Sequence, residues 1–132
     1  MTGSETESNI PLNGVRRVFL SHTSELAQQP AGRTFVDAAM AGIRRAQALV
    51  DDMSSWTAGQ GSSAQECADR VARADVYVGL IGFRYGSPVR DRPDVSYTEH
   101  EYETAKDHGL QLRVFALSDE ASLPRSALVD AD

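Results

Sequence analysis

Apolar and polar positions along this chain alternate in blocks that predict strands separated by helices. Residues 15–21 (VRRVFLS) and 76–81 (VYVGLI) are rich in β-branched and aromatic side chains, which favour extended structure. The second block contains no charged residue, as expected for a strand that is buried on both faces of a sheet. Residues 48–52 and 110–117 predict two further strands.

Helical periodicity fills the intervals between these strands. Residues 34–47 carry their apolar side chains on one stripe, which predicts an amphipathic helix. A second helix is predicted over residues 64–74, and it begins with a capping box between Ser63 and Glu66. Its apolar stripe contains Cys67, for which we expect a place in the core and not the role of a nucleophile.

The third predicted helix covers residues 96–108. Ser96 provides its N-cap and Glu99 follows three residues later, which predicts another capping box, and Gly109 ends the helix. This helix follows the strand at residues 76–81 and carries three carboxylates in its first turns. Because ligands of open α/β sheets bind at the carboxyl edge of the strands, this segment is the first candidate for chemistry.

Strands that alternate with helices of this length predict a parallel sheet with helices on both faces, since each crossover connection is right-handed and returns along the sheet. We expect a flavodoxin-like three-layer α/β fold with a parallel sheet of four to five strands. The domain is expected to span residues 14–118. Residues 1–13 are polar and are expected to form a disordered leader, and residues 119–132 a linker or the start of a missing element.

Charge and cysteine content narrow the class of protein. The chain has 132 residues, a formal net charge of -6 and no basic run, which argues against a nucleic acid or an anionic membrane surface as partner. Its single cysteine excludes an internal disulfide framework, and its three histidines form no zinc-binding cluster. The sequence shows neither a signal peptide nor a membrane span, so we expect a cytoplasmic protein.

Four short motifs occur in a fixed order along the chain. They are residues 18–25 (VFLSHTSE), 74–79 (ADVYVG), 81–86 (IGFRYG) and 96–102 (SYTEHEY). The first resembles the first conserved box of Toll/interleukin-1 receptor (TIR) domains. Together the four motifs resemble a TIR-like bacterial domain family of unknown function, over about residues 15–117.

The resemblance implies a module at the N-terminus of a larger bacterial signalling or defence protein, ahead of a STAND or NACHT-type nucleotide-binding ATPase or a repeat region. Such a module acts by self-association through TIR-like surfaces. Some TIR domains cleave NAD+, so an assembly-gated NAD+ glycohydrolase is the alternative, with NAD+ as substrate and no tightly bound cofactor. A nucleoside deoxyribosyltransferase-like enzyme, which shares the fold, is a second alternative.

The catalytic carboxylate that the resemblance implies is Glu101. Residues 97–105 (YTEHEYETA) are similar to the pattern of NAD-cleaving TIR domains, with Tyr97 in place of a tryptophan and Ala105 at a small residue. Independently, Glu101 and Ala105 share one helix face, which puts the carboxylate at the margin of the buried stripe near the sheet edge. Glu99 is the alternate, although its simplest role is to cap the helix.

Several residues near the predicted carboxyl edge are candidate ligand contacts. Ser21 and His22 follow the first strand and could line the mouth of a pocket. Arg84 could bind a pyrophosphate and Tyr85 could stack on a base. Alternatively, Arg84 pairs with a carboxylate such as Asp94 or Glu99 while Tyr85 packs over the sheet edge. The full set of ligand-binding candidates is Ser21, His22, Arg84, Tyr85 and Tyr97. No metal site is predicted.

Overall fold

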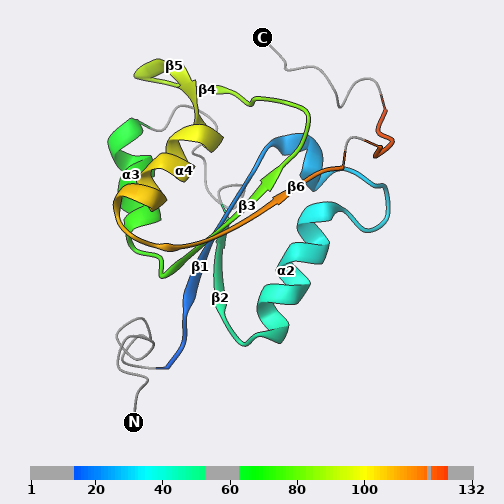
Figure 1. The fold of residues 1–132 in the computed structure, drawn as a ribbon, viewed down its shortest axis with the longest axis horizontal. Coiled ribbons are helices and arrows are strands. Elements are labelled where there is room, and N and C mark those ends of the chain that lie inside the picture. The colour runs from blue at the N-terminus through cyan, green and yellow to red at the C-terminus, as the bar shows by residue number, and fades with distance from the viewer. Residues whose placement is uncertain (1–13, 53–62, 119, 125–132) are drawn as a thin grey trace.

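A parallel four-stranded sheet forms the centre of the described structure (Figure 1). The computed structural model describes residues 14–52, 63–118 and 120–124, so the expected leader at residues 1–13 lies outside the described residues. The strand order β2-β1-β3-β6 is a flavodoxin-like arrangement and confirms the expected α/β class. The strands are β1 (Arg17–His22), β2 (Leu49–Asp52), β3 (Val76–Ile81) and β6 (Gln111–Ala116).

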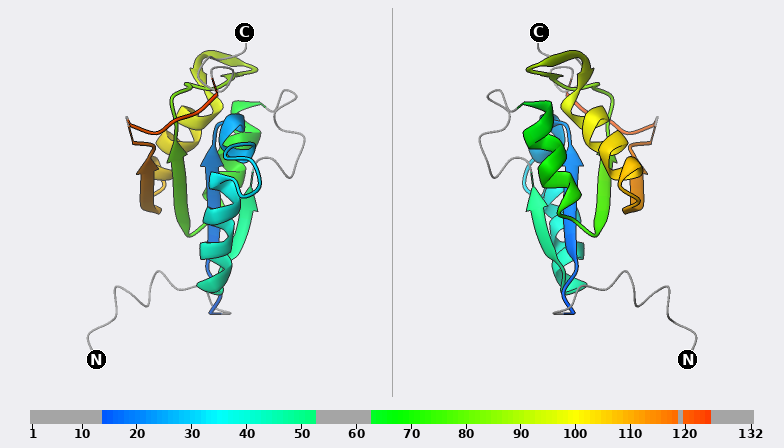
Figure 2. Two further views of the ribbon diagram at one scale, coloured as in Figure 1. Left: turned by 90° about the vertical axis from the view of Figure 1, so that its right-hand side faces the viewer. Right: turned by 90° about the vertical axis from the view of Figure 1, so that its left-hand side faces the viewer.

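Helices cover both faces of the sheet, as the two side views in Figure 2 show. Helix α2 (Phe35–Arg45) lies on one face, and α3 (Ala64–Ala72) and α4 (Tyr97–Asp107) lie on the other. The capping box predicted at Ser63 and Glu66 is present, with reciprocal bonds of 3.0 Å and 2.9 Å. In the described part of the chain, no helix combines the length and the hydropathy needed to cross a bilayer.

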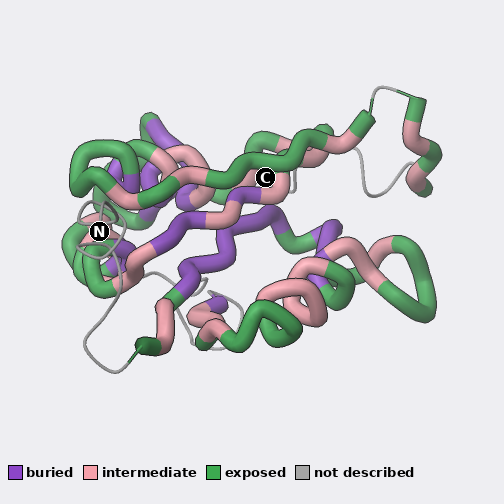
Figure 3. Tube along the Cα trace, turned by 60° about the horizontal axis from the view of Figure 1, so that its bottom comes forward, coloured by how far each residue is buried: buried purple, intermediate pink, exposed green. Residues whose placement is uncertain are grey.

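The core consists of two layers that meet at the central strands, where Figure 3 shows the buried positions to be concentrated. Adjacent side chains of β1 point to opposite faces of the sheet. Phe19 packs with Tyr77 on the face that carries α3 and α4, whereas Leu20 packs with Val36 of α2 on the other face. The two helical layers are therefore held together through β1.

Strand β6 lies at an edge of the sheet and is poorly covered. Val114 is 47% exposed and Phe115 is 60% exposed. Because neighbouring side chains of a strand point to opposite faces, β6 presents apolar surface on both faces. The expectation that residues 76–81 are buried on both faces is confirmed only in part, since Ile81, next to this edge, is 38% exposed.

Two features depart from the sequence prediction. The additional elements are the 3-10 helix η1 (Ser24–Ala27) and an antiparallel pair formed by β4 (Pro88–Val89) and β5 (Arg92–Ser96). Strand β5 contains Pro93 and has few apolar residues, so a search for apolar runs does not find it. Val89 and Val95 of this pair pack with Cys67 of α3. The hairpin therefore closes one end of the layer formed by α3 and α4.

Candidate functional site

Glu101 lies on the buried face of α4, toward the sheet. Its side chain is 0% exposed, as is that of Ala105 one turn later. The two residues share one helix face as expected, but Glu101 lies within the buried stripe and not at its margin. Helix α4 starts directly after β5, and Ser96 caps it by accepting a 3.1 Å bond from the Glu99 amide. This start brings Glu101 to the carboxyl end of β1.

Each carboxylate oxygen of Glu101 has a donor from a different element. Ser21 Oγ of β1 donates to Oε1 at 2.6 Å, and Cys67 Sγ of α3 donates to Oε2 at 3.6 Å. Burial raises the pKa of Glu101 to about 7, although the bonds from Ser21 and Cys67 and the charge of His22 lower it; the charge of Asp52 raises it again. The carboxyl group therefore titrates near neutral pH, where general acids and bases operate.

His22 and Asp52 form a buried ion pair near this carboxylate. His22 Nε2 lies 2.9 Å from Asp52 Oδ1, and His22 Nδ1 lies 2.9 Å from the carbonyl oxygen of Thr23. Because both partners are acceptors, this geometry favours the cationic ring, which carries a proton on each nitrogen. Burial lowers the pKa of His22, but the bonds to Asp52 and Thr23 and the charges of Asp52 and Glu101 outweigh it, and the net pKa is raised.

Tyr77 contributes to this cluster from β3. Its ring packs edge to face with Tyr102, with the ring centroids 5.9 Å apart. Burial raises the pKa of the Tyr77 hydroxyl, the nearby Ser21 hydroxyl lowers it, and the charge of Glu101 raises it further. The hydroxyl has no hydrogen bond of normal geometry among the described residues. A Cβ at Gly79 would lie 2.9 Å from this hydroxyl oxygen, so the glycine leaves the space that Tyr77 fills.

Cys67 is a packed member of the same cluster. Burial raises the pKa of its thiol, and the negative charge of Glu101 and the hydrogen bond to it raise the pKa further. A thiol in this state is a poor nucleophile at neutral pH. This agrees with the core position expected from the sequence. Among the described residues, no three His, Cys, Asp or Glu side chains are arranged to hold a metal ion.

The Arg84 side chain pairs with Glu25, whereas the sequence suggested a carboxylate such as Asp94 or Glu99. Arg84 Nη1 lies 3.8 Å from Glu25 Oε1, and Glu25 is 2% exposed. Thr23 Oγ1 donates to the other oxygen of Glu25 at 2.7 Å. A Cβ at Gly82 would lie 2.8 Å from that oxygen, so the glycine admits the carboxylate. The segments that follow β1 and β3 are thus joined at the carboxyl edge of the sheet.

The Tyr85 hydroxyl accepts the hydrogen bond from the Ser96 amide that the Glu99 carboxylate would accept in a capping box. The Tyr85 hydroxyl accepts a bond from the Ser96 amide at 3.1 Å and donates to the Glu99 carboxylate. The predicted capping box at Ser96 is therefore only half formed, because the phenol inserts between its two partners. Glu99 and Tyr85 anchor the loop after β3 to the start of α4.

Tyr97 is 6% exposed and packs with Cys67 in the layer between the hairpin and α3. Its hydroxyl accepts a bond from the Arg90 amide at 3.3 Å. Of the sequence candidates, the structure brings Ser21, His22 and Glu101 together in one buried cluster. Arg84, Tyr85 and Tyr97 have separate partners around it.

Three residues of this region were missed by sequence reasoning. Asp52 ends β2, and the rule that the carboxyl ends of parallel strands share one edge could have identified it. Tyr77 lies within a strand pattern that marks it only as a core aromatic residue. Glu25 lies in a polar turn, and no feature of the sequence marks that carboxylate as buried.

Comparison with protein families assigns this chain to a family. No curated protein and no solved structure matches the chain. A family model described as a domain of unknown function (DUF4062) matches residues 17–131, a range that includes every strand and helix named above. The chain therefore belongs to the DUF4062 family of domains of unknown function.

Proposed function

We propose that this domain cleaves the N-glycosidic bond of a nucleotide, that NAD+ is the substrate, and that Glu101 is the catalytic carboxylate. The observation that carries the proposal is the meeting of Glu101, Ser21 and the His22–Asp52 pair at the carboxyl edge of a parallel sheet. Ligands of such sheets bind at this edge. Clusters of buried ionisable groups with shifted pKa values are typical of functional sites.

The reaction breaks the bond between ribose C1′ and the nicotinamide nitrogen, and water supplies the hydroxyl group that replaces it. The products are ADP-ribose, nicotinamide and a proton. Positive charge develops on the ribose as the bond breaks, and a carboxylate held nearby stabilises that charge. Glu101 suits this role when ionised, above its pKa of about 7. The bond from Ser21 orients the carboxylate.

The candidate site is closed in this structure, since Ser21 and Glu101 are both 0% exposed. Substrate therefore reaches Glu101 only when the packing around it is rearranged. As part of the proposal, association of several copies produces this rearrangement, so that activity depends on assembly. Arg84 is the candidate for binding phosphate, because its guanidinium lies at the same edge of the sheet; its side chain is 15% exposed and pairs there with Glu25, so this contact must also open.

A second candidate function is a signalling module that acts by self-association alone. The observation in its favour is the edge strand β6, where Val114 is 47% exposed on the face that carries α4. Exposed strand edges with apolar side chains are places where another chain can add a strand. In this case the domain serves a larger cytoplasmic bacterial protein, whose ATPase or repeat region controls when copies meet, and Glu101 is structural.

The two functions are separated by incubating the purified domain, free and clustered on beads, with NAD+ or with a 2′-deoxynucleoside plus a free base. We expect nicotinamide release that requires clustering and is lost in Glu101→Gln. Glu103→Gln, a matched change on the exposed side of α4, should retain it. Base exchange on the deoxynucleoside alone would indicate the deoxyribosyltransferase-like alternative. No turnover by a folded, clustered sample would contradict the enzyme and favour the module.

A further inference from the structure

Strand β6 has an open edge that lacks the features by which proteins usually protect such edges. It is the last strand in the order β2-β1-β3-β6, so among the described elements it pairs with β3 alone. Residues 111–116 (QLRVFA) contain no proline and no carboxylate, and their register with β3 is continuous. Val114 and Phe115 are 47% and 60% exposed. A regular, apolar edge of this kind can accept a strand from another chain.

The hydrogen bonds to β3 determine which backbone groups of β6 face the open edge. The Gln111 amide donates to the Asp75 carbonyl at 3.3 Å, and the Leu117 amide donates to the Ile81 carbonyl at 2.7 Å. Because successive amides of a strand point to alternate sides, the odd-numbered residues of β6 bond β3. The even-numbered residues therefore turn their amides and carbonyls to the open edge, and these residues are Leu112, Val114 and Ala116.

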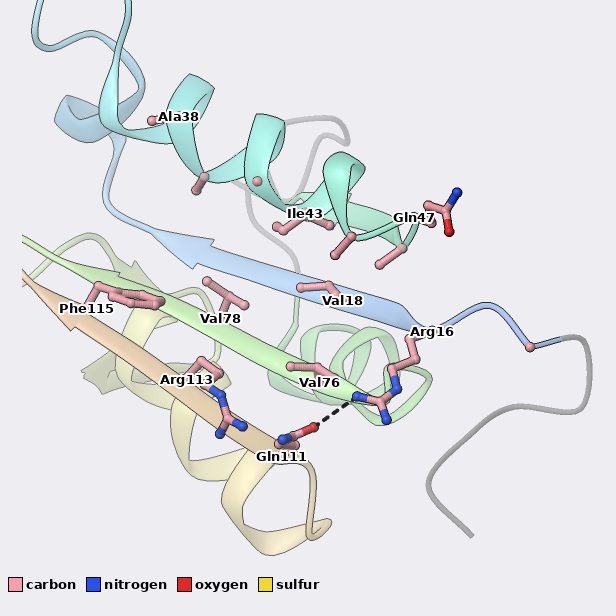
Figure 4. Close-up of a pocket in the computed structure, with 15 residues that line it drawn as sticks. Arg16, Val18, Ala38, Ile43, Gln47, Val76, Val78, Gln111, Arg113 and Phe115 are labelled. Atoms are coloured by element: carbon pink, nitrogen blue, oxygen red, sulfur yellow. Dashed lines mark hydrogen bonds between the residues drawn. The ribbon is translucent and has the colours of Figure 1, made fainter. Parts of the chain in front are cut away.

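The side chains of β6 give the strand two different faces. Figure 4 shows Gln111, Arg113 and Phe115 on the face that lines a groove of about 740 Å³ beside α2. Leu112 and Val114 lie on the opposite face. Arg113 Nη1 donates to the Leu112 carbonyl at 3.0 Å, so the only charged side chain of β6 lies over the open edge. A strand that adds at this edge therefore has to accommodate one cation beside an exposed aromatic ring.

We propose that β6 pairs antiparallel with β6 of a second copy of this chain, with Val114 opposite Val114 of the partner subunit on a two-fold axis. The pairing rests on the second candidate function, self-association, and specifies its partner and geometry. Val114 exchanges two backbone hydrogen bonds with its counterpart, and Leu112 does the same with Ala116 of the partner subunit. The sheets of the two copies then form one continuous sheet, and the interface is isologous.

The side chains favour this register over its neighbours. It places Arg113 opposite Phe115 of the partner subunit, at a non-hydrogen-bonded pair, where facing side chains lie closest. The guanidinium leaves the Leu112 carbonyl and stacks on the exposed ring, and the symmetry repeats this cation–π contact. A shift by two residues in either direction loses one of the backbone pairs. In one direction it also places Arg113 opposite its own counterpart, where like charges are unfavourable.

The register is tested by mild oxidation of cysteine variants of the full chain. Val114→Cys should form a disulfide-linked dimer, since the Cα atoms of a facing hydrogen-bonded pair are about 5.5 Å apart, within disulfide range. Ala116→Cys, at an exposed residue of the same strand face, is the matched control. It faces Leu112 of the partner subunit and lies about 13 Å from its own counterpart, so it should not link. The native Cys67 is buried and should not react.

Analytical ultracentrifugation tests the same pairing without cross-linking. Val114→Pro removes an amide that faces the open edge and none that bonds β3, so the fold should survive. We expect the dissociation constant of the dimer to rise by about tenfold or more. Phe115→Arg should also weaken the dimer, because it places two cations opposite each other. The double variant Arg113→Glu/Phe115→Arg should restore association, since opposite charges then face each other across the axis.

The outcomes separate this pairing from the function on which it rests. Equal cross-linking of Val114→Cys and Ala116→Cys, or a dimer of folded Val114→Pro as tight as that of wild type, would overturn the pairing while self-association through another surface stands. A wild-type chain that stays monomeric at every concentration would contradict both the pairing and the self-association function.

Discussion

Ser21 Oγ and Glu101 Oε1 are joined by a 2.6 Å hydrogen bond across 80 positions of sequence. The bond connects the end of β1 to the second turn of α4, and both residues are fully buried. A buried carboxyl oxygen that has no hydrogen-bond donor lowers the free energy of unfolding. Because Ser21 supplies this donor, the contact stabilises the packing of α4 against the sheet. The same contact orients the proposed catalytic group.

Ser21→Ala should lower the free energy of unfolding by about 1–3 kcal/mol, because Glu101 Oε1 would stay buried without its donor. The pKa of Glu101 should rise further, since the Ser21 bond lowers it. Urea denaturation measures the first effect, and NMR titration of the Glu101 carboxyl carbon measures the second. Ser87→Ala, at an exposed serine, is the control. Equal stability of the two variants would show that the bond contributes nothing.

Stability should fall as pH rises from about 4.5 to about 7. Between these values the folded protein keeps a proton on Glu101 that the unfolded chain has lost. The stabilisation is complete below the unfolded pKa and is lost as pH rises through the folded one, by up to about 3 kcal/mol. Denaturation at a series of pH values checks this in wild type and in Glu101→Gln.

His22 also makes stability fall as pH rises above 6.5, its ordinary pKa, because its pKa in the folded protein is raised. Glu101→Gln should therefore remove the pH dependence below that value and leave the part due to His22. A pH profile identical in wild type and Glu101→Gln would contradict the shifted pKa of Glu101.

Asp52→Asn should lower the pKa of His22, because it removes a charge and an anionic acceptor from the imidazolium. NMR titration of the ring resonances gives the value directly. Asp51→Asn is the matched control, since the neighbouring carboxylate bonds Arg70 instead. If the two substitutions move the His22 titration equally, the specific pairing with Asp52 is refuted.

Gly79→Ala should lower the free energy of unfolding by about 1–3 kcal/mol, because the new Cβ would lie 2.8 Å from a ring carbon of Tyr77. Tyr77→Phe alone should be nearly neutral, since the hydroxyl has no hydrogen bond of normal geometry among the described residues. In the double variant the loss should be smaller than for Gly79→Ala, because the contact with the hydroxyl is gone. Strictly additive effects in denaturation would argue against this contact.

The sequence pattern was sufficient to predict elements and contacts that depend on residues close together in the chain. The run at residues 76–81 coincides with β3, and Ser63 and Glu66 form the predicted capping box within one turn. The spacing of Glu101 and Ala105 also predicted that they share one helix face, since helical periodicity alone determines it, but not that Glu101 is fully buried.

The sequence pattern could not predict side-chain contacts between residues that are far apart in the chain. The buried ring of His22 is hydrogen-bonded to Asp52, which is 30 positions away. Arg84 faces Glu25 because two loops meet at the sheet edge. The half-formed capping box at Ser96 has the same cause, since Tyr85 arrives from an earlier loop. Local propensity contains no information on such encounters.

The most direct test of Glu101 as the catalytic group is nicotinamide release from NAD+ by the bead-clustered domain at about pH 6 and about pH 8, in wild type and in Glu101→Gln of verified fold. The account predicts faster release at the higher pH, where the carboxylate is ionised, and none from Glu101→Gln at either pH. Release by Glu101→Gln at the wild-type rate would contradict it.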